Sequence, residues 1–353
     1  MDKKVLSFGE LLLRICPDAG GEWLHEGQLP FYVGGAEANV ATALALWGVP
    51  SAYCTVLPDH SVARQVVGYL QSKGIDTSPV RWLGERMGLY FLTKGKDVRN
   101  AGVIYDRSCS SFSRLRPGVL DWDEILKDAG RLHFSAISPA LNDEVAAVCE
   151  EAVRAAVAKN IPVSVDLNYR VKLWQYGKKP LEVMPALVEC CDLVMGNIWA
   201  AEKMLGIPVD FGIHANSNKE EYLEQARVTS EQIMEQFPRV RMVANTFRFD
   251  EGATGIRYYT SLFAEGQLHI SEEYKAMRIL DKVGSGDCFM AGLLYGLHKQ
   301  LSLPDTLEFA TSAAFQKLFI LSDATDQTVE DIERGGKTYA GERQKVRGTK
   351  WEQ

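Results

Sequence analysis

The sequence predicts an α/β fold, in which strands and helices alternate along the chain and build a mainly parallel sheet. Short apolar runs rich in β-branched residues recur along the chain, and longer stretches with the period of about 3.6 residues of a helix lie between them. The chain has 353 residues, of which 46% are hydrophobic and 24% charged. This composition provides enough apolar material for a full core and is typical of a globular protein.

The predicted strands are short apolar runs that would be buried in the sheet. They are residues 4–8, 52–56, 131–134, 163–167, 193–195 and 240–244. The predicted helices carry apolar residues at helical spacing. They are residues 37–46, 62–72, 143–158, 231–236, 286–299 and 304–319. Because most strands are followed by a helix, we expect βα units around a mainly parallel sheet.

Two stretches, residues 12–33 and 85–113, break this alternation. Each has strand-like residues separated by glycines and turns, and the second contains the period-2 segments GLYFLTKG and NAGVIYDRS. Together they predict a small antiparallel sheet that covers a ligand as a lid. The alternative is a pair of hairpins that only pack on the core. We expect one domain over residues 1–333 that includes this lid, and then a basic tail over residues 334–353.

The charge balance disfavours a nucleic-acid partner, since 39 Lys and Arg stand against 46 Asp and Glu for a net charge of −7. The apolar runs are shorter than the roughly 20 residues that a membrane helix needs, and we find no signal-peptide pattern. We therefore expect a cytoplasmic protein with no membrane partner. The seven cysteines and six histidines form no ligand-spaced cluster, so we expect reduced thiols and no metal held by histidines.

The strongest local signal is the segment from Asp281 to Asp287, DKVGSGD, which leads directly into the apolar stretch CFMAGLLYGLHK. Gly284 and Gly286 allow a tight turn, so the amides of Gly284, Ser285, Gly286 and Asp287 can converge at a helix start. Such amides, together with the helix dipole, suit the oxygens of a phosphate. Asp287 either caps the helix or takes the proton of a substrate hydroxyl, and the residues alone leave both roles open.

A second signal is the segment GGAEANVA, which begins with Gly34 and Gly35. These glycines let the backbone approach a small polar ligand, and Asn39 offers donors and acceptors to its hydroxyls. The alternative is a strand-to-helix turn with a local side-chain hydrogen bond.

Together these two segments resemble the N-terminal and C-terminal signatures of the ribokinase-like, or PfkB, family of carbohydrate kinases, over about residues 9–330. The resemblance implies a ribokinase-like three-layer sandwich with a small β lid, and ATP and Mg²⁺ as cofactors. It also implies that Asp287 is the general base and that the backbone of Gly284, Ser285 and Gly286 forms the anion hole.

Further segments resemble the 2-dehydro-3-deoxygluconate (KDG) kinase branch of this family, among them FGELLLRICP, VIYDRSCSSFS, VDLNYRVKLW and MGNIWAAEKMLGIP. The resemblance implies transfer of the ATP γ-phosphoryl group to the 6-hydroxyl of this sugar acid. It implies substrate contacts from the lid, the diglycine segment and the segment VDLNYR. These contacts are Tyr90 and Tyr105, Gly34, Gly35 and Asn39, Arg107, and Asn168, with Arg170 nearer the phosphates as a catalytic residue.

A substrate with a carboxylate needs a cation, and Arg107 and Arg170 are the candidates, each with a surface ion pair as its alternative role. For the nucleotide, we expect contacts from Asn197, Thr246 and Arg248. Other sugar kinases of the family, such as a fructokinase, remain alternatives. So does a non-catalytic sugar-acid-binding protein on the same fold.

The sequence departs from the family pattern at several positions. Lys282 stands where the family commonly has Thr, Ser285 replaces Ala, and Ala200 occupies the acidic position of the NxxE motif, with Glu202 two residues further on. The last departure leaves the organisation of Mg²⁺ open. Because a lid sheet has free edges, we also expect a homodimer through the lid.

Overall fold

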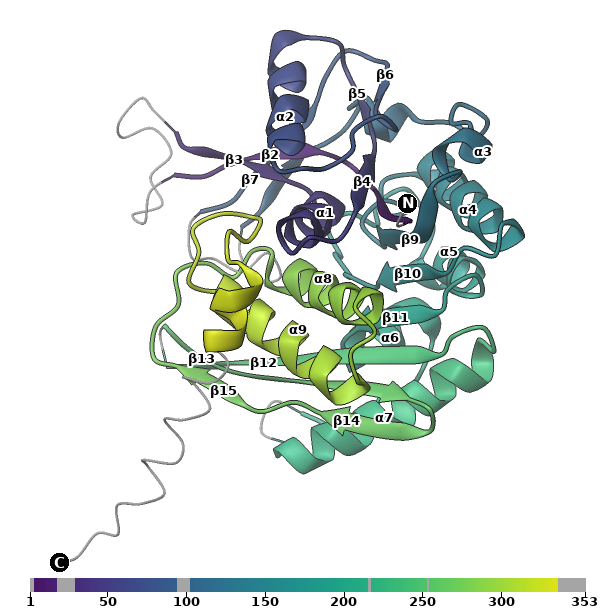
Figure 1. The fold of residues 1–353 in the computed structure, drawn as a ribbon. Coiled ribbons are helices and arrows are strands. Elements are labelled where there is room, and N and C mark those ends of the chain that lie inside the picture. Colours follow the sequence, from purple (N-terminus) through teal and green to yellow (C-terminus); the bar gives the residue numbers. More distant parts are fainter. Residues whose placement is uncertain (1–2, 18–28, 94–101, 215–216, 253, 336–353) are drawn as a thin grey trace, which may run out of the picture.

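A nine-stranded sheet runs through the centre of the part of the chain that the structure describes (Figure 1). The structure is a computed structural model, and it describes residues 3–17, 29–93, 102–214, 217–252 and 254–335. The strand order is β14-β13-β12-β11-β10-β9-β1-β4, and β15 pairs with β13. The six strands from β12 to β4 are parallel to their neighbours, whereas β13, β14 and β15 are antiparallel. The predicted α/β class with a mainly parallel sheet is therefore confirmed.

The parallel strands are continuous apolar runs because helices cover both faces of the sheet. They are β1 (Lys4–Phe8), β4 (Ser51–Cys54), β9 (Ala129–Ser135), β10 (Val163–Asp166), β11 (Leu193–Gly196) and β12 (Met242–Glu251). The antiparallel strands at one edge are β13 (Gly255–Ala264), β14 (Gln267–Ile270) and β15 (Tyr274–Ala276).

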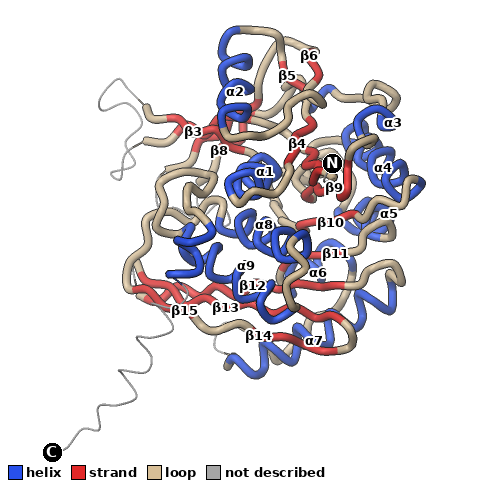
Figure 2. The backbone as a smooth tube through the Cα atoms, in the orientation of Figure 1, coloured by secondary structure: helices blue, strands red, loops and turns tan. Residues whose placement is uncertain are grey.

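The helices form two layers, one on each face of the sheet (Figure 2). One layer contains α1 (Ala36–Leu46), α8 (Ser285–His298) and α9 (Leu303–Lys317). The other contains α4 (Asp143–Ala158), α5 (Pro180–Val188), α6 (Ile198–Leu205) and α7 (Lys219–Gln236). Shorter or peripheral elements are α2 (Ser61–Ser72), α3 (Trp122–Ile125) and a 3₁₀ turn (Phe112–Arg114). Two helix layers around one sheet make the predicted three-layer sandwich.

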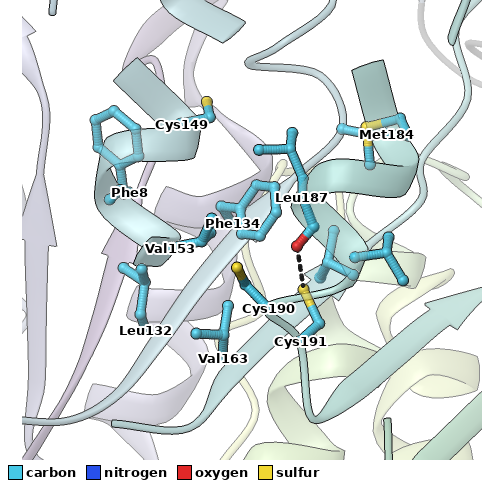
Figure 3. Close-up of a cluster of buried hydrophobic side chains, with 14 of the residues drawn as sticks. Phe8, Leu132, Phe134, Cys149, Val153, Val163, Met184, Leu187, Cys190 and Cys191 are labelled. Carbon is cyan, nitrogen blue, oxygen red and sulfur yellow. Dashed lines mark hydrogen bonds between the residues drawn. The ribbon is translucent and has the colours of Figure 1, made fainter. Parts of the chain in front are cut away.

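Buried side chains fill the space between the sheet and each helix layer. Figure 3 shows part of the core under α4 and α5, where Phe8, Leu132 and Phe134 of the sheet lie near Cys149 and Leu187 of the helices. On the opposite face, a second core forms between the sheet and α1, α8 and α9. Helix α8 therefore packs between α1 and α9, and this packing fixes its N-terminus relative to the strand ends.

The predicted lid is a four-stranded sheet in the order β3-β2-β7-β8. Its strands are β2 (Leu12–Ile15), β3 (Phe31–Gly34), β7 (Gly88–Phe91) and β8 (Ile104–Asp106). The two outer pairs are antiparallel, and the central pair β2–β7, which joins the two insertions, is parallel. A separate two-stranded sheet contains β5 (Val56–Leu57) and β6 (Arg81–Trp82).

The predicted tail falls mostly on residues 336–353, which lie outside the described residues, as do residues 18–28 and 94–101 of the predicted lid stretches. The division into a domain over residues 1–333 and a tail stays a prediction. Among the described residues, no helix combines the length and the apolar composition that crossing a bilayer requires. The cytoplasmic location also stays a prediction.

Candidate active site

A cavity of about 470 Å³ opens at the carboxyl ends of the parallel strands, between the lid and the start of α8. Ligands of open α/β sheets commonly bind at this edge. Its wall contains most of the residues that the sequence predicted for the site. These are Gly35, Asn39, Tyr90, Tyr105, Arg107, Asn168, Arg170, Asn197, Thr246, Arg248, Gly284, Gly286 and Asp287.

The start of α8 presents its backbone amides to this cavity. Gly284 is the N-cap residue, in the left-handed conformation with φ 77°, and no side chain caps the helix. A Cβ at Gly284 would lie 1.8 Å from the carbonyl oxygen of Asp323, so only glycine fits there. Because the first amides of a helix have no carbonyl partner one turn earlier, those of residues 284–287 can receive an anion. Ser285 contributes only its backbone, since its hydroxyl is buried and donates to the carbonyl oxygen of Ala314 at 3.1 Å.

Asp287 is buried at this helix start, and Nδ2 of Asn39 donates to its Oδ2 at 2.7 Å. Burial raises the pKa of Asp287 to about 7, against the opposing effect of the Asn39 hydrogen bond. The nearby carboxylates of Asp166 and Glu37 raise this pKa further, and the charge of Arg170 lowers it. A carboxyl group that titrates near neutral pH is suited to accept a proton. Since Gly284 is the N-cap residue and no side chain caps α8, Asp287 is not the cap, and its role as the base stays a prediction.

Glu37 and Asp166 are two further carboxylates in the cavity wall that the sequence did not single out. Oε1 of Glu37 accepts from the amide and the hydroxyl of Ser135 at 2.9 and 2.6 Å, and burial raises its pKa to about 7. Oδ1 of Asp166 accepts from the amide of Asn168 at 3.0 Å. Asp166 ends strand β10, so its place at the carboxyl edge of the sheet was a signal available in the sequence.

The lid contributes two tyrosines to the wall, Tyr90 on β7 and Tyr105 on β8, with ring centroids 6.5 Å apart. The hydroxyl of Tyr90 donates to Asp323. Gly34 does not line the cavity, in contrast to the predicted substrate contact. A Cβ at Gly34 would lie 2.7 Å from Oδ2 of Asp323 and 3.2 Å from the ring of Tyr90, so this glycine makes room for that hydrogen bond.

Arg107 lines the cavity but already has a buried counter-ion. Its Nε donates to Oε2 of Glu10 at 2.5 Å, and the hydroxyl of Ser110 donates to Oε1 of Glu10 at 2.5 Å. The side chains of Arg107 and Glu10 are only 6% and 1% exposed. Arg107 is therefore part of a buried ion pair, and any contact with a substrate carboxylate is made by a guanidinium that Glu10 already orients.

Three lysines that the sequence did not assign to the site also line the cavity, namely Lys172, Lys203 and Lys282. Nζ of Lys172 donates to the carbonyl oxygen of Val103 at 3.0 Å, and Nζ of Lys282 donates to Asp250 at 2.6 Å. With Arg170, they bring cationic side chains to the wall, although Lys203 and Lys282 are ion-paired with Glu202 and Asp250. Cationic side chains suit phosphates and a sugar carboxylate.

At the nucleotide side, Thr246 and Arg248 come from β12 and Asn197 precedes α6. Oδ1 of Asn197 caps α6 by accepting from the amide of Ala200 at 2.8 Å. Glu202 does not line the cavity, and it pairs with Lys203 at 2.8 Å. It therefore does not replace the acidic residue that the family's NxxE motif has at the position of Ala200.

The donor set fits Mg²⁺ only if phosphates supply most of the ligands. Among the described residues, no group of three or more His, Cys, Asp or Glu side chains is placed to hold a cation. Asp166 and Asp287 are lining carboxylates, and Mg²⁺ is commonly held by one or two carboxylates together with phosphate oxygens and waters.

A buried acid beside open helix amides, in a cavity at the strand ends of an α/β sandwich, is an arrangement suited to phosphoryl transfer. The pfkB family of carbohydrate kinases matches residues 2–319, and the chain belongs to this family. The resemblance found in the sequence is thereby confirmed, as is the assignment to carbohydrate kinases.

Several individual relatives are named as kinases of dehydro-deoxy sugar acids, and others are named as fructokinases. The crystal structure of 2-dehydro-3-deoxygluconokinase from Thermotoga maritima is 33% identical, with a TM-score of 0.86 over 96% of this chain and 99% of that one. The 2-dehydro-3-deoxygalactonokinase of Haloferax volcanii is 34% identical over 175 residues, which are 49% of this chain and 54% of that protein. The 5-dehydro-2-deoxygluconokinase of Geobacillus thermodenitrificans is 26% identical over 85% of this chain and 84% of its own length.

Proposed function

We propose that this carbohydrate kinase transfers the γ-phosphoryl group of ATP to the 6-hydroxyl of 2-dehydro-3-deoxy-D-gluconate, with Mg²⁺ as its metal cofactor. The observation that carries the proposal is the carboxylate of Asp287, held by Asn39 at the mouth of α8 beside the open amides. The structural similarity to a 2-dehydro-3-deoxygluconokinase supports the choice of substrate.

In the proposed reaction, Asp287 takes the proton of the 6-hydroxyl as that oxygen attacks the γ-phosphorus, and ADP leaves on the opposite side. The amides of residues 284–287 and the guanidinium of Arg170 stabilise the charge on the equatorial phosphate oxygens. Asp166, a lining carboxylate, would help to hold Mg²⁺ together with the nucleotide phosphates, and the metal would supply positive charge that offsets the charge of those phosphates. Tyr90 and Tyr105 close the sugar side and limit access of water.

The basic wall supports a substrate with a carboxylate. Arg107, Arg170 and Lys172 all line the cavity, and a sugar carboxylate would give these cationic groups an anionic partner that a neutral hexose lacks. An ion-paired Arg107 can still bind an anion, because the planar guanidinium has donors besides its Nε.

A panel of sugars tests the proposal. The purified protein is incubated with ATP, Mg²⁺ and either KDG, its galactose-derived epimer, 5-dehydro-2-deoxygluconate or fructose, and ADP is measured. We expect the highest kcat/KM with KDG, and ³¹P NMR of the product should locate the phosphate on C6. A higher kcat/KM for any other sugar would reject KDG as the substrate.

Two alternatives belong to the same panel. Activity on the galactose-derived epimer is favoured by the similarity to 2-dehydro-3-deoxygalactonokinase. A fructokinase would prefer the neutral ketose. No ADP formation with any sugar, together with binding of KDG by calorimetry, would point to the non-catalytic sugar-acid-binding alternative.

A further inference from the structure

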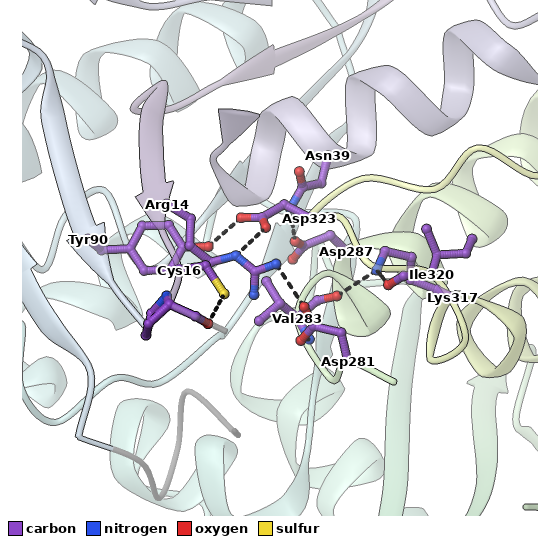
Figure 4. Close-up of polar contacts among 11 residues, drawn as sticks. Arg14, Cys16, Asn39, Tyr90, Asp281, Val283, Asp287, Lys317, Ile320 and Asp323 are labelled. Carbon is purple, nitrogen blue, oxygen red and sulfur yellow. Dashed lines mark hydrogen bonds and ion pairs between the residues drawn. The ribbon is translucent and has the colours of Figure 1, made fainter. Parts of the chain in front are cut away.

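A buried network of charges involves the segment that leads into α8 (Figure 4). Arg14, on lid strand β2, forms ion pairs with Asp281 at 2.7 Å and with Asp323 at 2.8 Å. These three side chains are at most 1% exposed. The network therefore joins the lid to the segment that leads into the anion hole, because Asp281 lies three residues before Gly284.

Lys317, the last residue of α9, approaches the same segment from the other side. It is 0% exposed, and its Nζ donates to the carbonyl oxygens of Val283 at 3.0 Å and Ile320 at 3.2 Å. Burial lowers the pKa of Lys317, and the carboxylate of Asp281 raises it. The ammonium thus has backbone dipoles as direct partners, while Asp281 is ion-paired with Arg14.

The ammonium of Lys317 lies next to the backbone that forms the anion hole. Val283 immediately precedes Gly284, and a Cβ at Gly284 would lie 3.4 Å from Cε of Lys317. The carbonyl of Val283 and the N–H of Gly284 belong to one planar trans peptide group, so when the oxygen points at Lys317 the N–H points in the opposite direction. Gly284 is the N-cap of α8, so the orientation of this peptide group also affects where the amides of residues 285–287 lie. A buried ammonium is costly, and an apolar side chain of similar length would fill the same space at lower cost.

We propose that Lys317 is a positioning residue for phosphoryl transfer: its ammonium fixes the carbonyl of Val283 and thereby orients the amides of residues 284–287 toward the transferring phosphoryl group. It acts through the backbone and does not touch the substrate. The inference rests on the proposed kinase reaction, but not on which sugar is the acceptor.

The test compares Lys317→Met with Gln316→Leu. Gln316 is the neighbouring buried polar residue of α9, and it bonds to Ser312 and to the carbonyl oxygen of Ile332, away from the anion hole. Gln316→Leu should unfold at a lower temperature than wild type, whereas Lys317→Met should unfold at or above the temperature of wild type, because it removes a buried charge. Lys317→Met should lower kcat about 100-fold with the KM for the sugar changed less than about threefold, because a small displacement of catalytic groups has large effects on rate. Gln316→Leu should keep the kcat of wild type. A kcat within twofold of wild type for Lys317→Met would overturn the proposal.

Chemical rescue separates positioning from loss of packing. Lys317→Ala leaves a space lined by two carbonyl oxygens, and ethylammonium or potassium chloride should restore kcat at least tenfold, whereas sodium chloride at equal ionic strength should not. Equal recovery in all three salts, or no recovery in any, would contradict a role for a cation at this place.

A replacement variant and a wild-type control complete the experiment. If Lys317→Met does not fold, Lys317→Gln takes its place, since its amide can still donate to one carbonyl but carries no charge; the same loss of kcat is expected, and wild-type kcat would overturn the proposal. Wild-type protein is assayed first on the sugar panel. Absence of turnover there rejects the proposed function, whereas normal turnover in wild type and in the Lys317 variant rejects only this inference.

Discussion

Asn39 and Asp287 are 248 residues apart in the sequence, yet Nδ2 of Asn39 lies 2.7 Å from Oδ2 of Asp287. The contact joins α1, which follows the diglycine segment, to the first turn of α8. The hydrogen bond from Asn39 orients the carboxylate, and although it lowers the pKa of Asp287, burial raises that pKa more. The two strongest sequence signals therefore meet at one carboxylate, and the main predictions concern this acid.

Replacing Asp287 by Asn should remove the proton acceptor and keep the shape of the site. We expect kcat to fall about 10²- to 10⁴-fold, which is the usual contribution of a general base. KDG affinity, measured by calorimetry, should change little, because the amide can still bond to Asn39 and to the sugar hydroxyl. Normal turnover by this variant would show that Asp287 is not the base.

The pH dependence of activity follows from the raised pKa of Asp287, which burial brings to about 7. Only the ionised carboxylate can accept a proton, so kcat/KM should increase with pH and reach half its maximum near pH 7. Because the pKa of Glu37 is also raised to about 7, Glu37→Gln is the control that separates the two titrations. A half-maximum near pH 4 in wild type would argue against the buried acid as the base.

The raised pKa of Asp287 also makes the stability of the protein depend on pH. In the unfolded chain an Asp ionises near pH about 4, so between pH 4 and 7 the folded protein binds the additional proton. Wild type therefore loses stability as the pH rises through this window. Asp287→Asn does not titrate, and its free energy of unfolding relative to wild type should increase from pH 5 to pH 8 in urea titrations. A difference that stays constant with pH would contradict the raised pKa.

Gly284 and Gly286 form a matched pair for substitution by Ala. At Gly284 the backbone is left-handed and a Cβ would lie 1.8 Å from a carbonyl oxygen, so Gly284→Ala should lose both stability and activity. At Gly286 the nearest atom to a new Cβ is Cε of Met195 at 3.7 Å, which is ordinary contact. Gly286→Ala should thus keep its melting temperature within a few degrees but raise the KM for ATP, because the Cβ would reach into the phosphate site. An unchanged KM would mean that the phosphates do not approach this residue.

The strands and the anion-hole segment were predictable because their signals are local. Parallel strands buried on both faces are continuous apolar runs, and the glycines of GSGD encode the tight turn directly. Helix α7 was predicted only over residues 231–236, although it begins at Lys219, because its first turns are rich in charged and polar residues that hide the apolar period. Helix α5 contains Pro185 within its short span, which obscured it as well.

The site residues that the sequence could not assign depend on contacts between distant segments. The ion pair of Arg107 with Glu10 spans 97 residues, and no local pattern distinguishes a paired arginine from a free one. The same holds for Gly34, which the motif placed beside the substrate but which lies beneath the Tyr90–Asp323 hydrogen bond. Sequence patterns thus indicated which segments meet at the cavity, but the contacts of each side chain could be seen only in the structure.

The role of Arg107 in substrate binding can be separated from its ion pair with Glu10 by a double variant. Arg107→Ala should raise the KM for KDG at least tenfold more than the KM for a neutral ketose, if the guanidinium binds the sugar carboxylate. It should also destabilise the protein, because it leaves Glu10 buried and unpaired, whereas the double variant Arg107→Ala, Glu10→Gln should recover part of that stability. If the double variant also recovers KDG affinity, Arg107 acts through Glu10 and not on the substrate.

The predicted homodimer through the lid concerns the two edge strands of the lid sheet. Phe31 on β3 is 62% exposed and Ile104 on β8 is 58% exposed, so both edge strands of the lid sheet carry a large exposed apolar side chain. We expect light scattering on a sizing column to give the mass of a dimer, and Phe31→Glu with Ile104→Lys to shift it toward the monomer. Phe211→Glu, at an exposed aromatic residue outside the lid, is the control and should leave the mass unchanged. A monomeric wild type would reject the dimer. A dimer that persists in the lid variant would place the interface outside the lid.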